Sequence, residues 1–238
     1  MKETASLIMK SCPTCGLCNR PQFNNKAPLV PIRTGFFNEI LHIDFGGPYK
    51  ITPNGNRYLL IMIDNFTNWP NAIATKDATA QTTIEVIMQH WVCHFGMPFR
   101  IHSDRGSNFE CETFQGVCQM LGIKKSRNTS FHPICNSKAE RLIGSLKKMV
   151  EKLCLENKEP WDKTIHLALL AYRSCVQKST KFSPHYLLFG RPMKLPIELQ
   201  LGLIETERFT EDNYVINLQQ MLLKTYEQVR LNYDATHE

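Results

Sequence analysis

Three strand-like segments follow one another closely in the first third of the chain, and this succession restricts the fold more than any other feature. The segments cover residues 39–45, 57–64 and 71–76, and Asn54-Gly55 lies between the first two. An Asn-Gly pair between apolar runs is a strong signal for a β-hairpin. Because short connections join neighbouring antiparallel strands, the sequence predicts a three-stranded antiparallel meander.

Helices and strands alternate after the meander. Thr79 suits the N-cap position of a helix, and Gly96-Met97-Pro98 closes that helix. The segments that follow are a strand over 99–104, a helix over 110–121, a short strand over 123–128, and helices over 137–153 and 161–175. This order predicts an α/β domain in which a mixed five-stranded sheet is flanked by helices. It is the ribonuclease-H-like arrangement.

Composition places the chain among ordinary globular proteins. Of its 238 residues, 42% are hydrophobic and 21% are charged. The net charge of +6 is compatible with a polyanionic partner without requiring one. Nine cysteines lack the density of a disulfide scaffold, and no run of 18 apolar residues occurs. We therefore expect a soluble intracellular protein with no membrane partner.

Three carboxylates stand at predicted element boundaries. Asp44 and Asp104 lie at the carboxyl ends of strands, and Glu140 lies near the start of an amphipathic helix. In a mixed sheet, ligand sites collect where strands end and helices begin. Alone, Glu140 is explained by its favourable position at a helix N-terminus. Together, the three acids are expected to converge on one point.

A cluster of three acids needs a cation, because neighbouring carboxylates repel one another and raise each other's pKa. Ligation by oxygen alone selects Mg²⁺ or Mn²⁺. Two such ions can activate an attacking oxygen and stabilise a leaving oxygen in phosphoryl transfer. The acids therefore indicate metal-dependent attack on a phosphodiester.

Several ordered blocks resemble the integrases of retroviruses and gypsy-type LTR retrotransposons. HIDFGGP (42–48), HSDRGSNF (102–109) and HPICNSKAERLIGSLKKMV (132–150) resemble the three acidic blocks of that family. The likeness extends to FGMPFRIHSD, to STKFSPHYLLFGRPMKLP (179–196) and to an amphipathic tail helix at 210–234, so it covers about residues 12–235.

The resemblance implies a ribonuclease-H-like catalytic core and a two-metal mechanism. It assigns Asp44, Asp104 and Glu140 as catalytic acids that bind Mg²⁺ or Mn²⁺. The implied activity is DNA 3′-end processing followed by strand transfer, which is DNA integration. The implied partners are double-stranded DNA, both element ends and target, and further copies of the chain. The implied setting is a Gag-Pol-type element acting in the nucleus.

A cysteine cluster precedes the core. Cys12, Cys15 and Cys18 are closely spaced, and a Cys-x-x-Cys pair is half of a tetrahedral zinc site. An unmetallated cysteine turn explains the same residues equally well. By resemblance, Cys12 and Cys15 match the second half of a His-His-Cys-Cys zinc module, which would bind Zn²⁺ only if the His half were supplied. We divide the chain into a zinc-module remnant and linker (1–36), a catalytic core (37–195), and a linker with the tail helix (196–238).

The third acidic block departs from the family pattern at three positions. The family usually has Gln, Gly and Asn where this chain has Ile134, Ser137 and Ile143. The zinc-module histidines and a C-terminal SH3-like or chromodomain piece have no counterpart. These departures motivate a second hypothesis, a decayed or domesticated module that binds DNA or protein without turnover. A plain ribonuclease H is a third hypothesis, and it leaves the cysteine pair and the C-terminal blocks unexplained.

Other residues have competing interpretations. Asp64 ends the second strand and is a rival first acid, although a turn aspartate explains it better. His90 and His94 have metal-ligand spacing on a helix, but a solvated helix face is the more common explanation. His102 and His132 flank the acids, and each is more often a histidine satisfied by hydrogen bonds.

Basic residues gather around the third acidic block. Beside an acid cluster they are better interpreted as phosphate contacts than as a solvated basic face. The predicted DNA-binding residues are Lys124, Lys125, Arg127, Asn136, Lys138, Arg141, Lys147 and Lys148.

Overall fold

A computed structural model describes residues 34–127, 137–157, 159–202 and 211–235. The chain divides into two compact units, residues 1–30 and 31–238, and the described residues all belong to the second. The strands are β1 (Ile40–Gly46), β2 (Tyr58–Asp64), β3 (Pro70–Thr75), β4 (Arg100–Ser103) and β5 (Lys124–Arg127). The helices are α3 (Ala80–Ile87), the π-helix η1 (Met88–Val92), α4 (Cys93–Phe95), α5 (Ser107–Glu110), α6 (Glu112–Met120), α7 (Ser137–Asn157), α8 (Trp161–Ser174), α9 (Pro184–Phe189), α10 (Pro196–Gln200) and α11 (Glu211–Ala235).

The five strands form one mixed sheet in the order β3-β2-β1-β4-β5. Strands β1, β2 and β3 pair antiparallel, which confirms the predicted meander. Strand β4 pairs parallel to β1, and β5 pairs parallel to β4. The crossover therefore places β1 at the centre of the sheet, directly beside β4.

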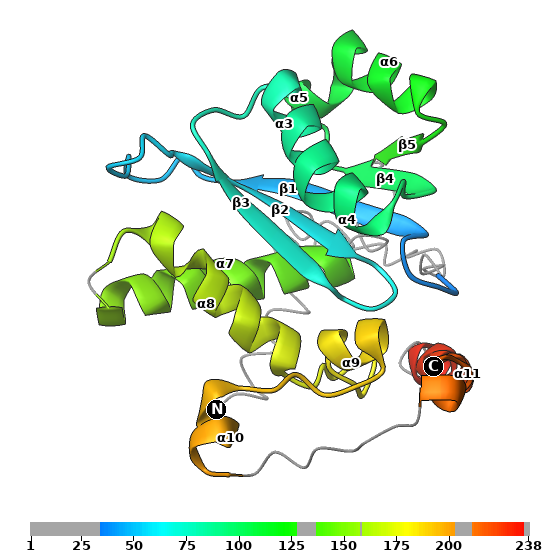
Figure 1. Ribbon diagram of the computed structural model, residues 1–238. Helices are drawn as coiled ribbons and strands as arrows, with labels where there is room; N and C mark the ends of the chain where they lie inside the picture. The colour runs from blue at the N-terminus through cyan, green and yellow to red at the C-terminus, as the bar shows by residue number, and fades with distance from the viewer. Residues whose placement is uncertain (1–33, 128–136, 158, 203–210, 236–238) are drawn as a thin grey trace, which may run out of the picture. The chain divides into compact units, whose positions relative to one another are not determined.

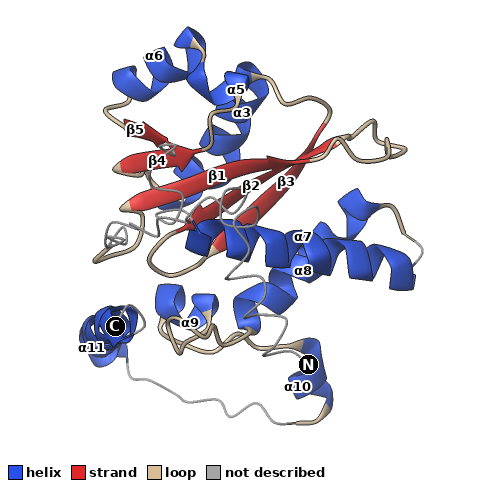
Figure 2. Ribbon diagram, turned by 180° about the vertical axis from the view of Figure 1, so that it is seen from behind, coloured by secondary structure: helices blue, strands red, loops and turns tan. Residues whose placement is uncertain are grey.

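Helices cover both faces of the sheet (Figures 1 and 2). On one face, Leu41 and Ile43 of β1 pack with residues of α3 and α6. On the other, Leu59 and Ile61 of β2 pack with residues of α7 and α8. Alternate residues of a strand point to opposite faces, so the almost uninterrupted apolar run of β2 supplies both cores, while β1 supplies only the first.

The first predicted helix is irregular. Thr79 caps α3 as expected, with its hydroxyl oxygen accepting a hydrogen bond from the Thr82 amide at 3.2 Å. The helix then passes into η1, where the Asn71 side chain donates to the carbonyl of His90 at 2.8 Å. A side chain that bonds into a helical ladder is a known cause of such irregularities. The predicted helix over 110–121 forms as α6, and the unpredicted short helix α5 precedes it, separated by the extended Cys111.

The tail helix folds back on the sheet unit. Val229 of α11 is fully buried with Phe66 and Leu187. The Arg230 guanidinium donates to the Gly35 carbonyl at 2.6 Å, so α11 contacts a residue close to the start of the described chain. Helices α9 and α10 were not predicted from the sequence. Within the described residues, no helix is both long and apolar enough to cross a membrane.

Candidate metal and nucleic-acid site

Two of the predicted acids lie at the same edge of the sheet. The parallel pairing of β1 and β4 sets His42 opposite His102. Asp44 and Asp104 each come two residues after this pair, and Asp104 directly follows β4. Because residues two apart on a strand share a face, both acids follow the histidine pair on the face that α7 covers. The register therefore brings Asp44 and Asp104 to the same edge of the sheet, and their convergence with Glu140 on one point stays a prediction.

Asp44 has a cation beside it that the sequence did not assign to it. The Lys147 ammonium lies 3.1 Å from Asp44 Oδ2 and 3.3 Å from the Phe45 carbonyl oxygen. About a third of the Asp44 side chain (32%) and a quarter of the Lys147 side chain (26%) remain exposed. The ion pair connects the middle of α7 to the end of β1.

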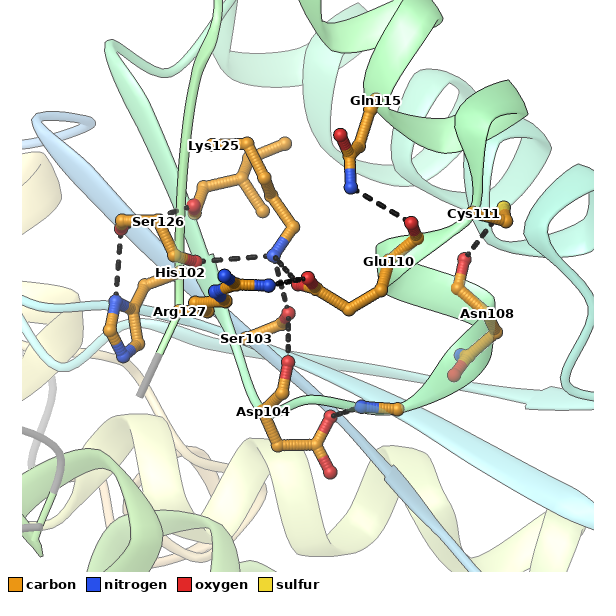
Figure 3. A network of polar contacts seen from close by, with 12 residues as sticks. His102, Ser103, Asp104, Asn108, Glu110, Cys111, Gln115, Lys125, Ser126 and Arg127 are labelled. Atoms are coloured by element: carbon orange, nitrogen blue, oxygen red, sulfur yellow. Dashed lines mark hydrogen bonds and ion pairs between the residues drawn. The ribbon is translucent and has the colours of Figure 1, made fainter. Parts of the chain in front are cut away.

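Asp104 is exposed, and its orientation is set by its own turn (Figure 3). Asp104 Oδ1 accepts a hydrogen bond from the Gly106 amide at 2.9 Å. A Cβ at position 106 would come within 2.6 Å of Asn108 Oδ1 and 3.1 Å of Asp104 Oδ1, so a side chain there would displace these two side chains from their positions. The Ser103 hydroxyl also donates to the Asp104 carbonyl at 2.8 Å.

Glu140 is placed by its helix. Its backbone lies in the first turn of α7, while its side chain lies outside the described part of the structure. Helix α7 is held on the sheet by Ile143, Leu146 and Val150, each at most 5% exposed. Ile143, which stands where the family usually has Asn, therefore serves the core.

The residues present fit a hard divalent cation. Asp44 and Asp104 supply carboxylate oxygens, the ligand type that Mg²⁺ and Mn²⁺ prefer. Asp44 already attracts a cationic group at bonding distance. Among the described side chains, no three His, Cys, Asp or Glu residues are grouped closely enough to hold a metal ion, and the predicted third ligand, Glu140, is not among them. Cys12 and Cys15, the predicted partial zinc site, also lie outside the described residues.

Two of the predicted phosphate contacts are engaged by a carboxylate that sequence reasoning missed (Figure 3). Glu110 of α5 forms ion pairs with Arg127 and, at 3.7 Å, with Lys125. The Lys125 ammonium also donates to the Ser103 hydroxyl at 2.6 Å. Burial lowers the pKa of Lys125, and the Glu110 carboxylate opposes that shift. Lys125 is therefore a structural cation inside this network, and its partner Glu110 carried no periodic or motif signal.

The other predicted DNA-binding residues divide into two groups. Lys124, Arg141 and Lys148 are exposed, as phosphate contacts must be. Asn136 and the Lys138 side chain lie outside the described residues.

The rival candidates have structural roles. Asp64 is fully buried, and its carboxylate accepts hydrogen bonds from the Asn38 amide at 2.9 Å and the Thr67 amide at 2.7 Å. It pairs with Leu41, which places it at the far end of β1 from Asp44. Asp64 is thus a turn aspartate. Its full burial beneath these bonds leaves it no access to a substrate.

Among the described residues, the histidines do not form a metal site. His94 is exposed and His90 is half-buried, and among the described residues no third ligand joins them. Burial and the neighbouring His94 lower the pKa of His90. His102 Nδ1 and the Ser126 hydroxyl share a hydrogen bond of 2.9 Å, and His132 lies outside the described residues.

Comparison with known proteins identifies the sheet unit. Residues 37–133 match the family described as Integrase core domain. This segment is similar to an integrase core domain. This segment contains Asp44 and Asp104 together with all five strands.

Relatives of this chain are retroviral polyproteins. The chain is 34% identical over 139 residues to the Gag-Pol polyprotein of woolly monkey sarcoma virus, covering 58% of this chain and 8% of that protein. It is 28% identical over 196 residues to the Pro-Pol polyprotein of feline foamy virus, covering 82% and 17% respectively. The chain therefore spans a small fraction of the length of these relatives.

Solved structures share the fold of this chain. A simian T-cell lymphotropic virus intasome in complex with PP2A regulatory subunit B56 gamma aligns with a TM-score of 0.63 and 24% identity, over 88% of this chain and 72% of that one. The HTLV-2 integrase catalytic core in complex with magnesium, in a trimeric form, aligns with a TM-score of 0.53 and 24% identity, over 64% and 97%. These likenesses confirm the ribonuclease-H-like sheet flanked by helices.

Proposed function

We propose that this chain is a divalent-metal-dependent polynucleotidyl transferase that processes DNA 3′ ends and joins them to target DNA. One observation carries the proposal: Asp44 in β1 and Asp104, which directly follows the parallel neighbour β4, lie at one sheet edge, and Glu140 lies in the first turn of α7, the helix that contacts Asp44. Three acids from three elements at one edge are what oxygen-ligated metal chemistry requires.

In this proposal, Asp44, Asp104 and Glu140 hold Mg²⁺ or Mn²⁺, which would polarise the scissile phosphate and lower the pKa of an attacking oxygen. Water attacks a phosphodiester near a 3′ end, and the P–O3′ bond breaks to leave a 3′-hydroxyl. That hydroxyl then attacks a target phosphodiester and displaces another 3′ oxygen, so no enzyme-bound intermediate forms. The Gly106 turn orients Asp104 for this role, and apolar residues of α7 hold on the sheet the helix whose first turn carries Glu140.

The nucleic-acid contacts follow from exposure. Lys124 on β5 and Arg141 and Lys148 on α7 are exposed, and we assign them to phosphates of double-stranded DNA. Phosphate contacts position DNA without reading its sequence. Element ends, target DNA and further copies of the chain are the proposed partners, and the nucleus is the proposed location. The intasome and trimeric-core relatives support DNA binding and self-association.

A strand-transfer assay tests the proposal. The full chain is incubated with a short DNA duplex and Mg²⁺ or Mn²⁺, beside Asp104→Asn and a control, Glu85→Gln. Glu85 is an exposed carboxylate on α3, on the opposite face of the sheet. Joining by the wild type and by Glu85→Gln, with a loss of at least 100-fold in Asp104→Asn, is expected. Joining that survives Asp104→Asn contradicts the assignment.

Binding without turnover is the second candidate. The observation that favours it is Ile143, an apolar core residue where the family usually has a polar one. Under this alternative, the wild type binds duplex DNA in a fluorescence anisotropy titration but joins none with either metal. Binding that weakens steeply with added salt would show phosphate contacts.

A further inference from the structure

We propose that Lys147 is a built-in competitor of the metal ion at Asp44, so that a divalent cation must displace the Lys147 ammonium in order to bind. The inference rests on the proposed function only in taking Asp44 as a metal ligand. It assigns to Lys147 a role that differs from the phosphate contact predicted from the sequence.

Lys147 already occupies an oxygen atom of Asp44. The Lys147 ammonium lies 3.1 Å from Asp44 Oδ2, within hydrogen-bond distance. It lies 3.3 Å from the Phe45 carbonyl oxygen as well. The ammonium therefore uses two of the oxygen atoms that β1 presents at this edge. A cation that takes Asp44 Oδ2 as a ligand has to take it from Lys147.

The packing at Gly46 leads the Lys147 side chain to this position. The Lys147 stem passes over the backbone of β1 at Gly46, where an added Cβ would lie 3.0 Å from Lys147 Cε. The same Cβ would lie 2.6 Å from the Tyr49 hydroxyl oxygen. Glycine at position 46 thus leaves room for the lysine and the tyrosine together. Such close packing distinguishes this pair from a loose surface contact.

The charges around the pair are mostly negative. The half-buried Tyr49 has its pKa raised by burial and by the negative charges of Glu151, one turn further along α7, and of Asp44. The ammonium is thus the cation that the described structure places at Asp44. An ammonium and a divalent ion about 4 Å apart repel strongly at the dielectric of a protein surface. Both cannot stay on one carboxylate oxygen, so metal binding is coupled to withdrawal of Lys147.

A purely structural tether gives a different expectation. If Lys147 only holds α7 on β1, removing its charge loosens the site and weakens metal binding. If Lys147 competes with the metal, removing its charge strengthens metal binding. The direction of the change separates the two interpretations, and damage to the fold cannot produce the second result.

The experiment is a calorimetric titration of the full chain with Mn²⁺ alone, without DNA. The variants are Lys147→Met, which keeps the length of the side chain and removes the charge, and Lys152→Met as the matched control. Lys152 is an exposed residue further along α7 with no assigned DNA contact, so the control makes the same change in net charge. We expect Lys147→Met to bind Mn²⁺ about three- to tenfold more tightly, since a partly exposed ion pair is worth up to about a factor of five and a partly buried one more. Lys152→Met should change the affinity less than about twofold.

Each outcome decides a separate point. Equal or weaker binding by a folded Lys147→Met overturns the competition while leaving the metal site in place. No Mn²⁺ binding by the wild type or by Lys147→Met overturns the metal site and the competition together. Folding is checked by circular dichroism and thermal unfolding, and Lys147→Gln replaces Lys147→Met if the latter does not fold. Lys147→Arg, which keeps the charge, should keep the wild-type affinity within about twofold.

Discussion

Replacing Glu110 should destabilise the fold more than replacing its partner Lys125, although the two residues share one ion pair. Glu110 neutralises Lys125 at 3.7 Å and also pairs with Arg127. In Glu110→Gln the Lys125 ammonium, whose side chain is only 13% exposed, loses its counter-charge. In Lys125→Met the Glu110 carboxylate keeps Arg127.

The magnitudes follow from that asymmetry. Removing one partner of a buried pair costs about 3–5 kcal/mol, and partial exposure here reduces the cost of Glu110→Gln to about 3 kcal/mol. Lys125→Met loses the ion pair and the hydrogen bond to Ser103, but it buries an apolar side chain instead. We expect about 1–2 kcal/mol for that change.

The pH dependence gives a second signature. Burial lowers the pKa of Lys125 below its value in the unfolded chain, and Glu110 opposes this shift. The native state therefore binds fewer protons than the unfolded state between the two pKa values, so stability rises with pH in that window. Glu110→Gln lowers the native pKa further and widens the window. The difference in free energy of unfolding between the wild type and Glu110→Gln should shrink between pH 7 and about pH 9.5. This range lies below the unfolded pKa of roughly 10.4.

Urea unfolding of both single variants and the double variant at pH 7 and 9.5 measures these free energies. Glu112→Gln, an exposed carboxylate at the start of α6, is the control and should cost less than about 1 kcal/mol. A Glu110→Gln cost below that of Lys125→Met, or a deficit that does not change with pH, would refute the reasoning.

Three further predictions concern the frame of the site. Leu146→Ala empties a fully buried position between α7 and the sheet and should cost about 3 kcal/mol in urea unfolding, with a smaller loss for Leu146→Met. Asp162→Ala should cost about 2–3 kcal/mol near neutral pH, because the carboxylate accepts three side-chain hydrogen bonds from the segment joining β1 and β2. Burial opposes ionisation of Asp162, yet those bonds lower its pKa overall, so its contribution is present above about pH 4 and is lost as pH falls through the native pKa; a cost that is unchanged at pH 2.5 would contradict this. Gly190→Ala should speed hydrogen exchange in α11, because Gly190 has φ +69° and a Cβ there would lie 2.4 Å from Leu218 Cδ1; protection equal to the wild type would show that α11 docks independently of this contact.

Local patterns in the sequence determined much of the fold. The turn at Asn54-Gly55 and the apolar runs around it predicted the antiparallel meander, which pairs as expected. The apolar stripe of α7 predicted the helix and the residues it buries, including Leu146. These features depend on periodicity and turn chemistry, which act over a few residues and can be recognised without the partner surface. The irregular turn at η1 and the short helix α5 were missed, and η1 involves a hydrogen bond from a side chain of β3 that no local pattern contains.

The tertiary structure decided which charged residues belong together. Asp44 and Asp64 both lie near strand ends in the sequence, but the register of β1 with β2 sends Asp64 to the far end of β1, where amides satisfy it. Lys125 and Lys147 both look like phosphate contacts, yet one pairs with Glu110 and the other with Asp44. The sequence by itself determined that acids stand at strand ends and that basic residues gather near them. The tertiary structure decided which acid pairs with which cation, through the crossover that sets β4 beside β1 and the packing of α7 on the sheet. Ion pairs between distant residues depend on contacts that no local pattern contains.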